Sequence, residues 1–337
     1  MGALMSSNAF PVEGRTVLIA GGSKGTGLEA ARQLAAKGGN IILIARDPQR
    51  LRDAIEYVKA GALSPETQRF HFIAADLTSN EACTNVIAQS TAWNAGLPPD
   101  VVWCFAGSSH PTLFVDTDAA QLKAQMDANY FSSAYMAHAA LRSWLKTGQG
   151  PKDEVFAKAG KPLARHIIFT SSFLALYPIA GYAPYSPSKA ALRSLSDSLS
   201  QELNLYATAN PYLPSIKVHT LFPATIFTEA FEAENRIKSD MTKMLEETDD
   251  GQTPEVVARK SIQGLESGHE LITSDFLTRF VLSTMMGASK RGGFLTAFVD
   301  WILGCLGLLI LVFVRRDMDR KVRNWGKLHG DSGVKSQ

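Results

Sequence analysis

A tyrosine and a lysine stand four positions apart in "YSPSKAAL", residues 185–192. Residues at this spacing lie on one face of a helix, so Tyr185 and Lys189 are predicted to project into the same space. An ammonium group beside a phenol favours the phenolate, and it should lower the pKa of the tyrosine from about 10 toward neutral pH. Such a phenol can donate and accept a proton. An isolated pair of this kind is often an ordinary surface pair, so the prediction depends on its companions.

Two further polar residues have suitable positions in the chain. Ser172 ends the run "IIFTSS", where a strand would deliver its hydroxyl to a substrate oxygen. Asn129, in "MDANYF", is expected within a long helix, where its amide could organise a water relay to Lys189. Taken singly, Ser172 could be a helix cap or turn residue, and Asn129 could be a hydrogen-bonded buried amide.

A glycine pattern, "AGGSKGTG" (20–27), directly follows the first apolar run and opens the first helical stretch. In this context Gly21 allows a tight turn, and Gly25 lets the backbone approach a pyrophosphate at the positive end of the helix dipole. Gly27 permits close packing of helix and strand. The pattern predicts a dinucleotide site, although its spacing is GxxxGxG rather than GxGxxG.

The end of the second apolar run indicates which dinucleotide is bound. NAD enzymes commonly place a carboxylate there for the ribose 2′-hydroxyl, whereas "LIARDPQR" places Arg46. Arg46, helped by Lys24 and Arg50, could bind a 2′-phosphate, which predicts NADPH. The alternative is a solvated surface arginine. Asp76 and Leu77 fall where a side chain and backbone could meet adenine, although Asp76 could equally cap a helix.

The positioning elements are alternating buried strands and amphipathic helices. Strands are predicted at 16–20, 41–45, 70–75, 101–106, 166–171 and 216–222. Helices are predicted at about 26–38, 48–60, 79–95, 118–147 and 185–208. The strands are almost continuously apolar, as expected when both faces of a sheet are covered. This βαβα order predicts an α/β fold with a doubly wound parallel sheet in a single domain.

Composition narrows the class of protein. The 337 residues are 45% hydrophobic and 20% charged with a net charge of +2, which is typical of a globular protein and gives no indication of nucleic-acid binding. The three cysteines, Cys83, Cys104 and Cys305, have neither disulfide nor metal-ligand spacing. The first fifteen residues resemble no secretory or transit peptide. The Gly-, Pro- and Lys-rich stretch 146–165 is predicted to be an exposed loop.

Near the other end, "FLTAFVDWILGCLGLLILVFV" (294–314) holds 21 residues with one charge, Asp300. This length matches a bilayer-spanning helix. The segment 315–337 carries seven Lys/Arg and three Asp/Glu, which favours a cytosolic tail. A buried core helix is the alternative, and Asp300 also leaves a re-entrant or interfacial segment open.

Taken together, these motifs resemble the short-chain dehydrogenase/reductase family over roughly residues 14–272. The motifs are "AGGSKGTG", "DLT", "FAG" (105–107), Asn129, Ser172 and "YSPSK", in this order. Within that family, "IARD", "ANYFSSAY", "FPATIFTEAFEAEN" and the membrane segment resemble the fungal 3-ketodihydrosphingosine reductases. Cys104 and Phe105 replace two asparagines common in the family, and Ala224 replaces a glycine, which puts loop detail in doubt.

The resemblance implies a Rossmann fold and NADPH-dependent reduction of 3-ketodihydrosphingosine to dihydrosphingosine in sphingolipid biosynthesis. Tyr185 would donate the proton, Ser172 would hydrogen-bond the carbonyl, and Lys189 would hold the ribose. The predicted cofactor-binding residues are Gly21, Ser23, Lys24, Gly25, Gly27, Arg46, Arg50, Asp76, Leu77, Tyr185 and Lys189. The predicted catalytic residues are Ser172, Tyr185, Lys189 and Asn129.

The resemblance also implies an endoplasmic reticulum membrane location, a cytosolic catalytic domain, and a homodimer or homotetramer. Glutamates 229, 232 and 234 could face the substrate's ammonium, but a solvated acidic helix face is the plainer interpretation. Two other functions remain open: a membrane-bound reductase of a sterol, retinoid or 3-ketoacyl thioester, and a catalytically silent NADP-binding scaffold.

The domain organisation follows from these segments. We predict an N-terminal extension (1–13), a catalytic domain (14–275) with a substrate lid at about 223–250, and a membrane-proximal segment (276–293). A membrane helix (294–314) and a basic tail (315–337) would follow.

Overall fold

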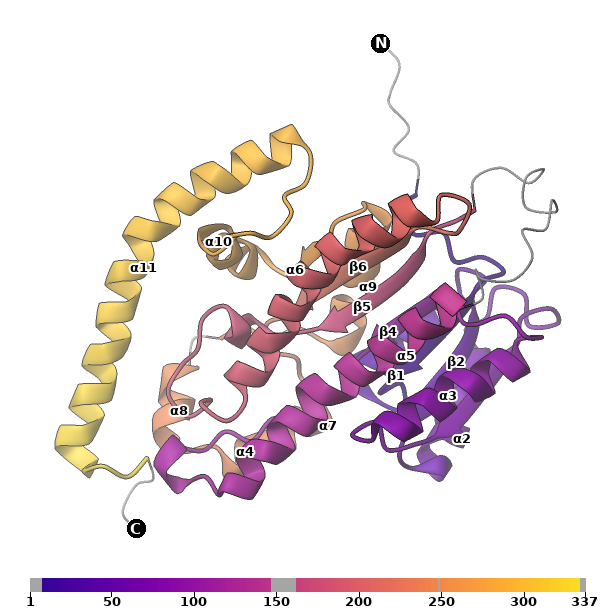
Figure 1. The fold of residues 1–337 in the computed structure, drawn as a ribbon. Helices are drawn as coiled ribbons and strands as arrows, with labels where there is room; N and C mark the ends of the chain where they lie inside the picture. Colours follow the sequence, from indigo (N-terminus) through magenta and orange to yellow (C-terminus); the bar gives the residue numbers. More distant parts are fainter. Residues whose placement is uncertain (1–7, 147–161, 248, 334–337) are drawn as a thin grey trace.

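Seven parallel strands form one sheet in the order β3-β2-β1-β4-β5-β6-β7 (Figure 1). The computed structural model describes residues 8–146, 162–247 and 249–333. The strands are β1 (Thr16–Ala20), β2 (Asn40–Ala45), β3 (Phe70–Ala74), β4 (Val101–Cys104), β5 (Arg165–Thr170), β6 (Ile216–Phe222) and β7 (Leu271–Thr273). The predicted doubly wound parallel sheet is confirmed.

Helices cover both faces of this sheet. They are α1 (Gly25–Ala35), α2 (Pro48–Lys59), α3 (Asn80–Trp93), α4 (Ala119–Met126), α5 (Ser132–Lys146), α6 (Ser186–Ala209), α7 (Glu229–Ile237), α8 (Asp240–Leu245), α9 (Pro254–Glu266), α10 (Phe276–Thr284) and α11 (Phe294–His329). One apolar core joins α1, α2 and α9 to the sheet, and a second joins α3, α5 and α6 to the opposite face. Burial on both faces explains why the strands are almost wholly apolar.

The chain runs outward from β1 in both directions, first to β2 and β3 and then to β4 through β7. In a parallel sheet of this order, ligands bind at the carboxyl ends of the strands beside the central reversal. The glycine loop follows β1, and Ser172 follows β5, so both lie at this edge.

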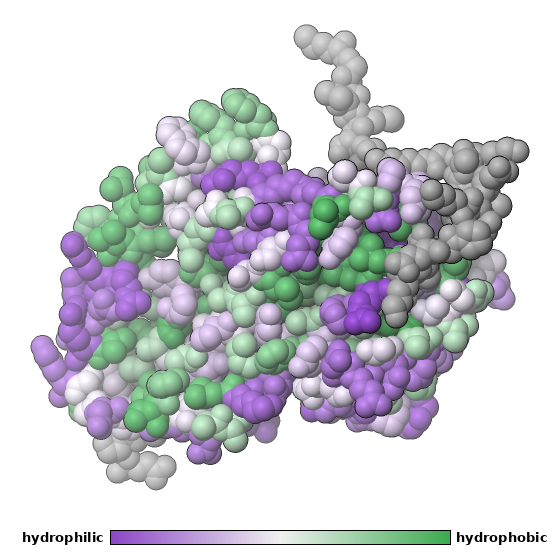
Figure 2. All heavy atoms as spheres, in the orientation of Figure 1, coloured by the Kyte–Doolittle hydropathy of each residue, from purple (hydrophilic) through white to green (hydrophobic). Residues whose placement is uncertain are grey.

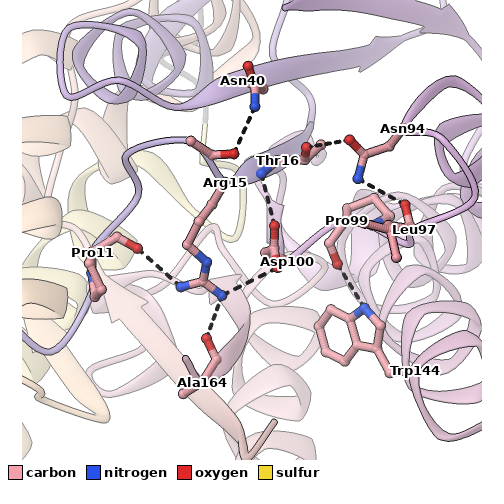
Figure 3. A network of polar contacts seen from close by, with 11 residues as sticks. Pro11, Arg15, Thr16, Asn40, Asn94, Leu97, Pro99, Asp100, Trp144 and Ala164 are labelled. Carbon is pink, nitrogen blue, oxygen red and sulfur yellow. Dashed lines mark hydrogen bonds and ion pairs between the residues drawn. The ribbon is translucent and has the colours of Figure 1, made fainter. Parts of the chain in front are cut away.

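A polar network joins the amino-terminal ends of the central strands, opposite the end of the sheet where the glycine loop and Ser172 lie (Figure 3). Arg15, just before β1, donates to the carbonyl of Ala164, just before β5, at 2.5 Å. Its guanidinium also lies 3.7 Å from the carboxylate of Asp100, which accepts a bond from the Thr16 amide at 3.0 Å. Thr16 in turn donates to Asn94 at 2.9 Å. The network fixes the starts of β1, β4 and β5. The strands that carry the candidate site at their carboxyl ends are therefore held in place at their amino-terminal ends.

Four features were not predicted. The short strand β7 was missed, and Phe10 and Val12, in the predicted N-terminal extension, are buried in the core. The helix expected at 118–147 is interrupted by a π-helical turn at Asp127–Phe131. The helix α11 continues fifteen residues beyond the predicted membrane helix, to His329. The predicted loop 146–165 lies mostly outside the described residues.

A buried histidine pair joins β5 to β6. The Nδ1 of His219 donates to the carbonyl of His269 at 2.7 Å, which leaves its Nε2 as the acceptor for the Nδ1–H of His166 at 3.0 Å. Burial lowers the pKa of His166 to about 2 and that of His219 to about 4. Both rings are therefore neutral in the folded protein at neutral pH.

We predict that this pair destabilises the fold as pH falls below about 6.5, where unfolded histidine takes a proton and the folded pair does not. The free energy of unfolding should fall by about 1.4 kcal/mol per pH unit for each histidine, until His219 titrates near pH 4. Urea unfolding at pH 7, 6 and 5 measures this slope. His166→Phe removes one of the two histidines, so it should reduce the slope by roughly half of the amount that the pair contributes. His138→Gln, at an exposed position, should leave the slope unchanged. Equal slopes in all three proteins would contradict the prediction.

Candidate active site

The glycine loop after β1 is too tightly packed to carry side chains at two positions. Gly21 has φ +88°, and a Cβ there would lie 2.6 Å from the amide nitrogen of Ala106. A Cβ at Gly27 would lie 2.4 Å from the carbonyl oxygen of Gly21. The amide of Gly21 donates to Ile44 in β2 at 2.7 Å. The loop therefore holds β1, β2 and α1 in close contact, in agreement with the turn and packing expected of these glycines.

Positive charge gathers at the start of α1. No side chain caps this helix at Lys24, so its first amides are open to an anionic ligand. The Nζ of Lys24 lies 3.9 Å, and the Nη1 of Arg50 3.6 Å, from the same carboxylate oxygen of Glu229 in α7. The side chain of Arg46, at the end of β2, is exposed and forms no ion pair with any residue that the structure describes. Lys24 and Arg50 already share one anionic partner, the Glu229 carboxylate, so this region is suited to binding a phosphate.

Asp76, beyond β3, lies in a local turn. Its carboxylate accepts from the amide of Thr78 at 3.1 Å and from the hydroxyl at 2.9 Å. These bonds lower the pKa of Asp76, and the charge of Arg46 lowers it further, which places Arg46 and Asp76 near each other. The alternative that Asp76 caps a helix is wrong, since Ser79 caps α3. The next residue, Leu77, is buried.

Ser172 and Tyr185 meet at the carboxyl end of β5. Ser172 lies two residues beyond the strand and caps a 3₁₀ turn, Phe173–Ala175, by accepting from the Leu174 amide at 3.1 Å. Burial raises the pKa of Tyr185 above that of a free phenol, and a hydrogen bond with the Ser172 side chain opposes the rise. The phenol is thus protonated at neutral pH and lies beside the Ser172 side chain.

Lys189 follows Tyr185 by one helical turn and is buried. Its Nζ donates to the carbonyl of Thr170 at 2.9 Å and lies 5.8 Å from the centre of the Tyr185 ring. Burial lowers the pKa of Lys189 to about 8. Ser171 fixes the same helix by donating to the Lys189 carbonyl at 2.8 Å. The expectation that Lys189 lowers the pKa of Tyr185 is wrong for this structure, because burial of the phenol outweighs the opposing interactions and the ammonium is directed at Thr170.

Asn129 is wholly buried in the π-helical turn between α4 and α5. Its Oδ1 accepts from the amide of Ser108 at 2.9 Å, and its Nδ2 donates to the carbonyl of Ser108 at 2.9 Å. A Cβ at Gly107 would lie 2.5 Å from this Oδ1 and 3.3 Å from the Nζ of Lys189. Asn129 therefore holds the loop after β4 against Lys189, in keeping with a hydrogen-bonded buried amide. A wider turn of this kind is often found at functional sites.

Sequence reasoning named Glu234 as a residue that could face the substrate's ammonium, but it missed the charged cluster beside Tyr185 to which Glu234 belongs. The Nζ of Lys238, buried at the end of α7, lies 3.2 Å from Glu234 and 2.5 Å from Glu246. The hydroxyl of Tyr182 donates to Glu234, and the Tyr182 ring lies 6.0 Å from that of Tyr185. The negative charge of Glu234 raises the pKa of Tyr185, which shows that the two groups are electrostatically coupled. Nothing in the local sequence distinguishes Glu234 from its exposed neighbours.

The lid that carries this cluster leaves and rejoins the domain at one point. Ile226 and Gln252 form a parallel bridge, and Phe227 donates to the carbonyl of Gln252 at 2.9 Å. The amide of Gln252 donates to Thr225 at 2.9 Å. Between these points lie α7 and α8, which contact the segment just before α6: Glu234 accepts from the Tyr182 hydroxyl, and the Thr242 hydroxyl donates to the carbonyl of Ala180. That this segment acts as a substrate lid stays a prediction.

Comparison with known proteins identifies relatives of the whole chain. The short chain dehydrogenase family matches residues 15–238. The 3-ketodihydrosphingosine reductase ksrA of Aspergillus fumigatus is 46% identical over 332 residues, covering 96% of this chain and 88% of the relative. The 3-ketodihydrosphingosine reductase gsl-3 of Neurospora crassa is 42% identical over 333 residues, covering 98% and 87%.

Solved structures support the fold alone. A short-chain type dehydrogenase/reductase from Mycobacterium ulcerans aligns with a TM-score of 0.62 and 20% identity, covering 78% of this chain and 89% of that chain. A dehydrogenase/reductase from Sinorhizobium meliloti aligns with a TM-score of 0.60 and 21% identity, covering 80% and 97%.

Proposed function

The chain belongs to the short-chain dehydrogenase family, and on this premise we propose that it reduces 3-ketodihydrosphingosine to dihydrosphingosine with NADPH. The observation that carries this proposal is that two fungal 3-ketodihydrosphingosine reductases match nearly the whole chain at 46% and 42% identity. The protein is an oxidoreductase with a nicotinamide cofactor, as its family and fold imply.

The choice of NADPH rests on the charge at the end of β2. Arg46 stands where a carboxylate would exclude a 2′-phosphate, and Lys24 and Arg50 lie close enough to one another to share an anionic partner. The open amides of α1 and the loop at Gly21 would take the pyrophosphate. Ser23, Gly25, Asp76 and Leu77 complete the proposed nucleotide-binding set, with Gly27 closing the loop behind it.

The polar residues at the end of β5 perform the proton chemistry. The bound nucleotide supplies a hydride for the ketone carbon. Tyr185, protonated because burial raises its pKa, donates its proton to the ketone oxygen as negative charge develops there. Ser172 hydrogen-bonds the same oxygen and positions it. Lys189 would hold the ribose, and Asn129 keeps the loop after β4 in place beside it.

The cluster at Glu234 would recognise the ammonium group of the substrate. Glu234 and Glu246 together carry one more charge than Lys238 neutralises, so a net negative charge lies beside Tyr185. The substrate carries its ammonium on the carbon next to the ketone, which would bring it into this region. Glu232 is exposed, in keeping with the solvated interpretation, whereas Glu229, also exposed, pairs with Lys24 and Arg50.

Glu234→Gln should raise the KM for 3-ketodihydrosphingosine roughly tenfold, because a charge-assisted interaction is lost. The KM for 1-hydroxyoctadecan-3-one, which lacks the amino group, should stay within about twofold. Steady-state kinetics with both ketones measures the difference, and Glu232→Gln on the same helix is the matched control. A similar rise in KM for both ketones would assign Glu234 to lid structure instead.

A turnover assay with the purified full-length protein tests the proposed function. The sphingoid ketone should be reduced with NADPH far faster than a sterol ketone, a retinaldehyde or a 3-ketoacyl thioester. Preferential turnover of one of those ketones would replace the substrate assignment. Nucleotide binding with no turnover of any ketone would favour a silent scaffold.

The cellular setting follows from the same proposal. Membrane association is consistent with α11, whose most apolar stretch is only 6% buried; this low burial contradicts the alternative of a core helix. We place the protein in the endoplasmic reticulum membrane with its catalytic domain in the cytosol. A homodimer or homotetramer would pair the long helices α5 and α6.

A further inference from the structure

The apolar half of α11 is attached to the catalytic domain through α10. Asp300, the one charge in the apolar segment, forms an ion pair with Arg279 of α10 at 3.2 Å. Gly304 and Gly307 are buried in the same contact, where a Cβ would lie 3.0 Å from the carbonyl of Ser283 and 2.3 Å from Thr284. The charge and the two glycines therefore serve a helix–helix contact, and they leave the opposite face of α11 uncovered.

The middle of α11 reaches the active-site region. Leu311 packs against the same small apolar cluster as Phe173, which directly follows Ser172, and Tyr177. Burial raises the pKa of Tyr177, and the charges of Arg315 and Asp319 act on it in opposite directions, so this turn of α11 lies beside Tyr177. The second attachment is thus at the edge of the catalytic site.

The far end of α11 is attached to the lid. Trp325 is buried and donates to the carbonyl of Ser332 at 3.0 Å, which turns the chain back after the helix. The amide of Met241 in α8 donates to the carbonyl of Gly333 at 3.3 Å. A Cβ at Gly333 would lie 2.9 Å from the Cβ of Ser239 and 3.2 Å from Leu113.

These attachments follow one face of a continuous helix. Less exposed positions recur along this face at intervals of three, four or seven, at 300, 304, 307, 311, 318, 322 and 325; the other less exposed positions of α11 are 296, 297, 303, 319, 321 and 329. The 36 residues of α11 extend for about 54 Å, against about 30 Å for a bilayer core. Figure 1 shows α11 running along one side of the molecule, from α10 to the neighbourhood of α8. Both halves of α11 contact the same domain. If that domain stays outside the bilayer, α11 cannot cross the bilayer without losing one of these sets of contacts.

We propose that α11 lies in the plane of the membrane surface, with its outer face in one leaflet, and that the protein is monotopic. The exposed surface of α11 is mostly apolar in its first part and mostly polar in its last part (Figure 2). The large exposed apolar residues of the first part are Phe294, Leu295, Phe298, Val299, Trp301, Ile302, Leu306, Leu308, Leu309, Ile310, Val312, Phe313 and Val314. Aliphatic and aromatic residues of this kind enter the headgroup boundary in surface-lying helices.

Charge and neighbouring surface favour a lipid bilayer over a second copy of the chain. Basic residues flank the apolar face on both sides: Arg291 before it and Arg316 after it are exposed and form no ion pair with the residues that the structure describes, so both can meet anionic headgroups. Phe276 and Leu277 of α10, 71% and 60% exposed, extend the apolar surface beyond α11. A membrane-seated surface of this extent brings Phe173 and Tyr177 to the lipid.

This arrangement deepens the proposed function, because a lipid ketone would pass from the leaflet to Ser172 without crossing water. It predicts that Ser239 and Gly333 remain neighbours in membranes. In full-length Ser239→Cys/Gly333→Cys protein with Cys305→Ser, reconstituted into phosphatidylcholine–phosphatidylserine vesicles, mild oxidation should link most of the chains. Ser239→Cys/Leu328→Cys, in which Leu328 is 77% exposed, should not link. Failure of the first pair in protein that binds vesicles would overturn the proposal.

Depth measurement tests the same placement without the paired substitutions. Nitroxide labels at Cys305 of the native chain, and at Phe298→Cys or Val312→Cys with Cys305→Ser, should all lie at one shallow depth, about 5–10 Å below the headgroups. A spanning helix would place Cys305 near the bilayer centre and the other two closer to opposite surfaces. If the labels are already shielded in lipid-free solution because chains associate, and their accessibility does not change when vesicles are added, the apolar face of α11 would be assigned to a second copy of the chain. Neither readout uses turnover, so failure of this proposal is distinguishable from failure of the substrate assignment.

Discussion

Tyr185→Phe should lower kcat for reduction of 3-ketodihydrosphingosine by roughly 10²- to 10⁴-fold, the usual range for loss of a general acid. The variant keeps the ring, its packing against Tyr182 and the helix α6, and it removes only the proton and its bond to Ser172. Binding of NADPH should change by less than about twofold. Stopped-flow measurement of nucleotide oxidation and a fluorescence titration of NADPH separate these two quantities.

Tyr212→Phe is the matched control for this substitution, because Tyr212 is 45% exposed and remote in sequence from the site. It should leave both quantities unchanged. Near-normal ketone reduction by the Tyr185 variant would remove the phenol from the mechanism and leave Ser172 or a bound water as the proton source.

Arg46→Asp should weaken NADPH binding by roughly 10- to 100-fold, because charge-assisted bonds to the 2′-phosphate are replaced by repulsion. Binding of NADH, which has no phosphate there, should be unchanged or tighter, since the new carboxylate can accept from the ribose hydroxyl. Dissociation constants for both nucleotides, measured at one ionic strength, give the ratio.

Arg52→Asp provides the control, because Arg52 lies on α2 and bonds only its neighbour Gln49 among the described residues. This variant should weaken neither nucleotide by more than about twofold. If the Arg46 substitution weakened the binding of NADPH and NADH equally, Arg46 would not bind the 2′-phosphate and would be an ordinary surface residue.

The main features of the fold were predictable because each depends on local pattern. Continuous apolar runs identified the six longer strands. The start of α9 is equally local, because the Thr253 hydroxyl, just before Pro254, accepts from the Val256 amide at 3.4 Å. The strand β7, Leu271–Thr273, was missed because three residues, of which only Ile272 is buried, carry too little periodicity. The π-helical turn at Asn129 was missed because it depends on the bonds that Asn129 makes to Ser108, far away in sequence.

The candidate site was predictable in its composition and less so in its electrostatics. The spacing of Tyr185 and Lys189 predicted that both side chains project into the same space, and the Lys189 Nζ lies 5.8 Å from the centre of the Tyr185 ring. The spacing could not anticipate that burial would raise the pKa of Tyr185, or that Lys189 would bond the carbonyl of Thr170. The cluster around Lys238 was hidden as well, because its three charged members and Tyr182 come together only when α7 and α8 fold over α6.

The paired ends of the lid at Ile226 and Gln252 have an evolutionary consequence. Since the chain departs from the domain and returns to it at one place, residues can be added or removed between those points without shifting any strand of the sheet. Changes of length there would alter what lies beside Tyr185 while the strands that carry Ser172 and the glycine loop stay in place.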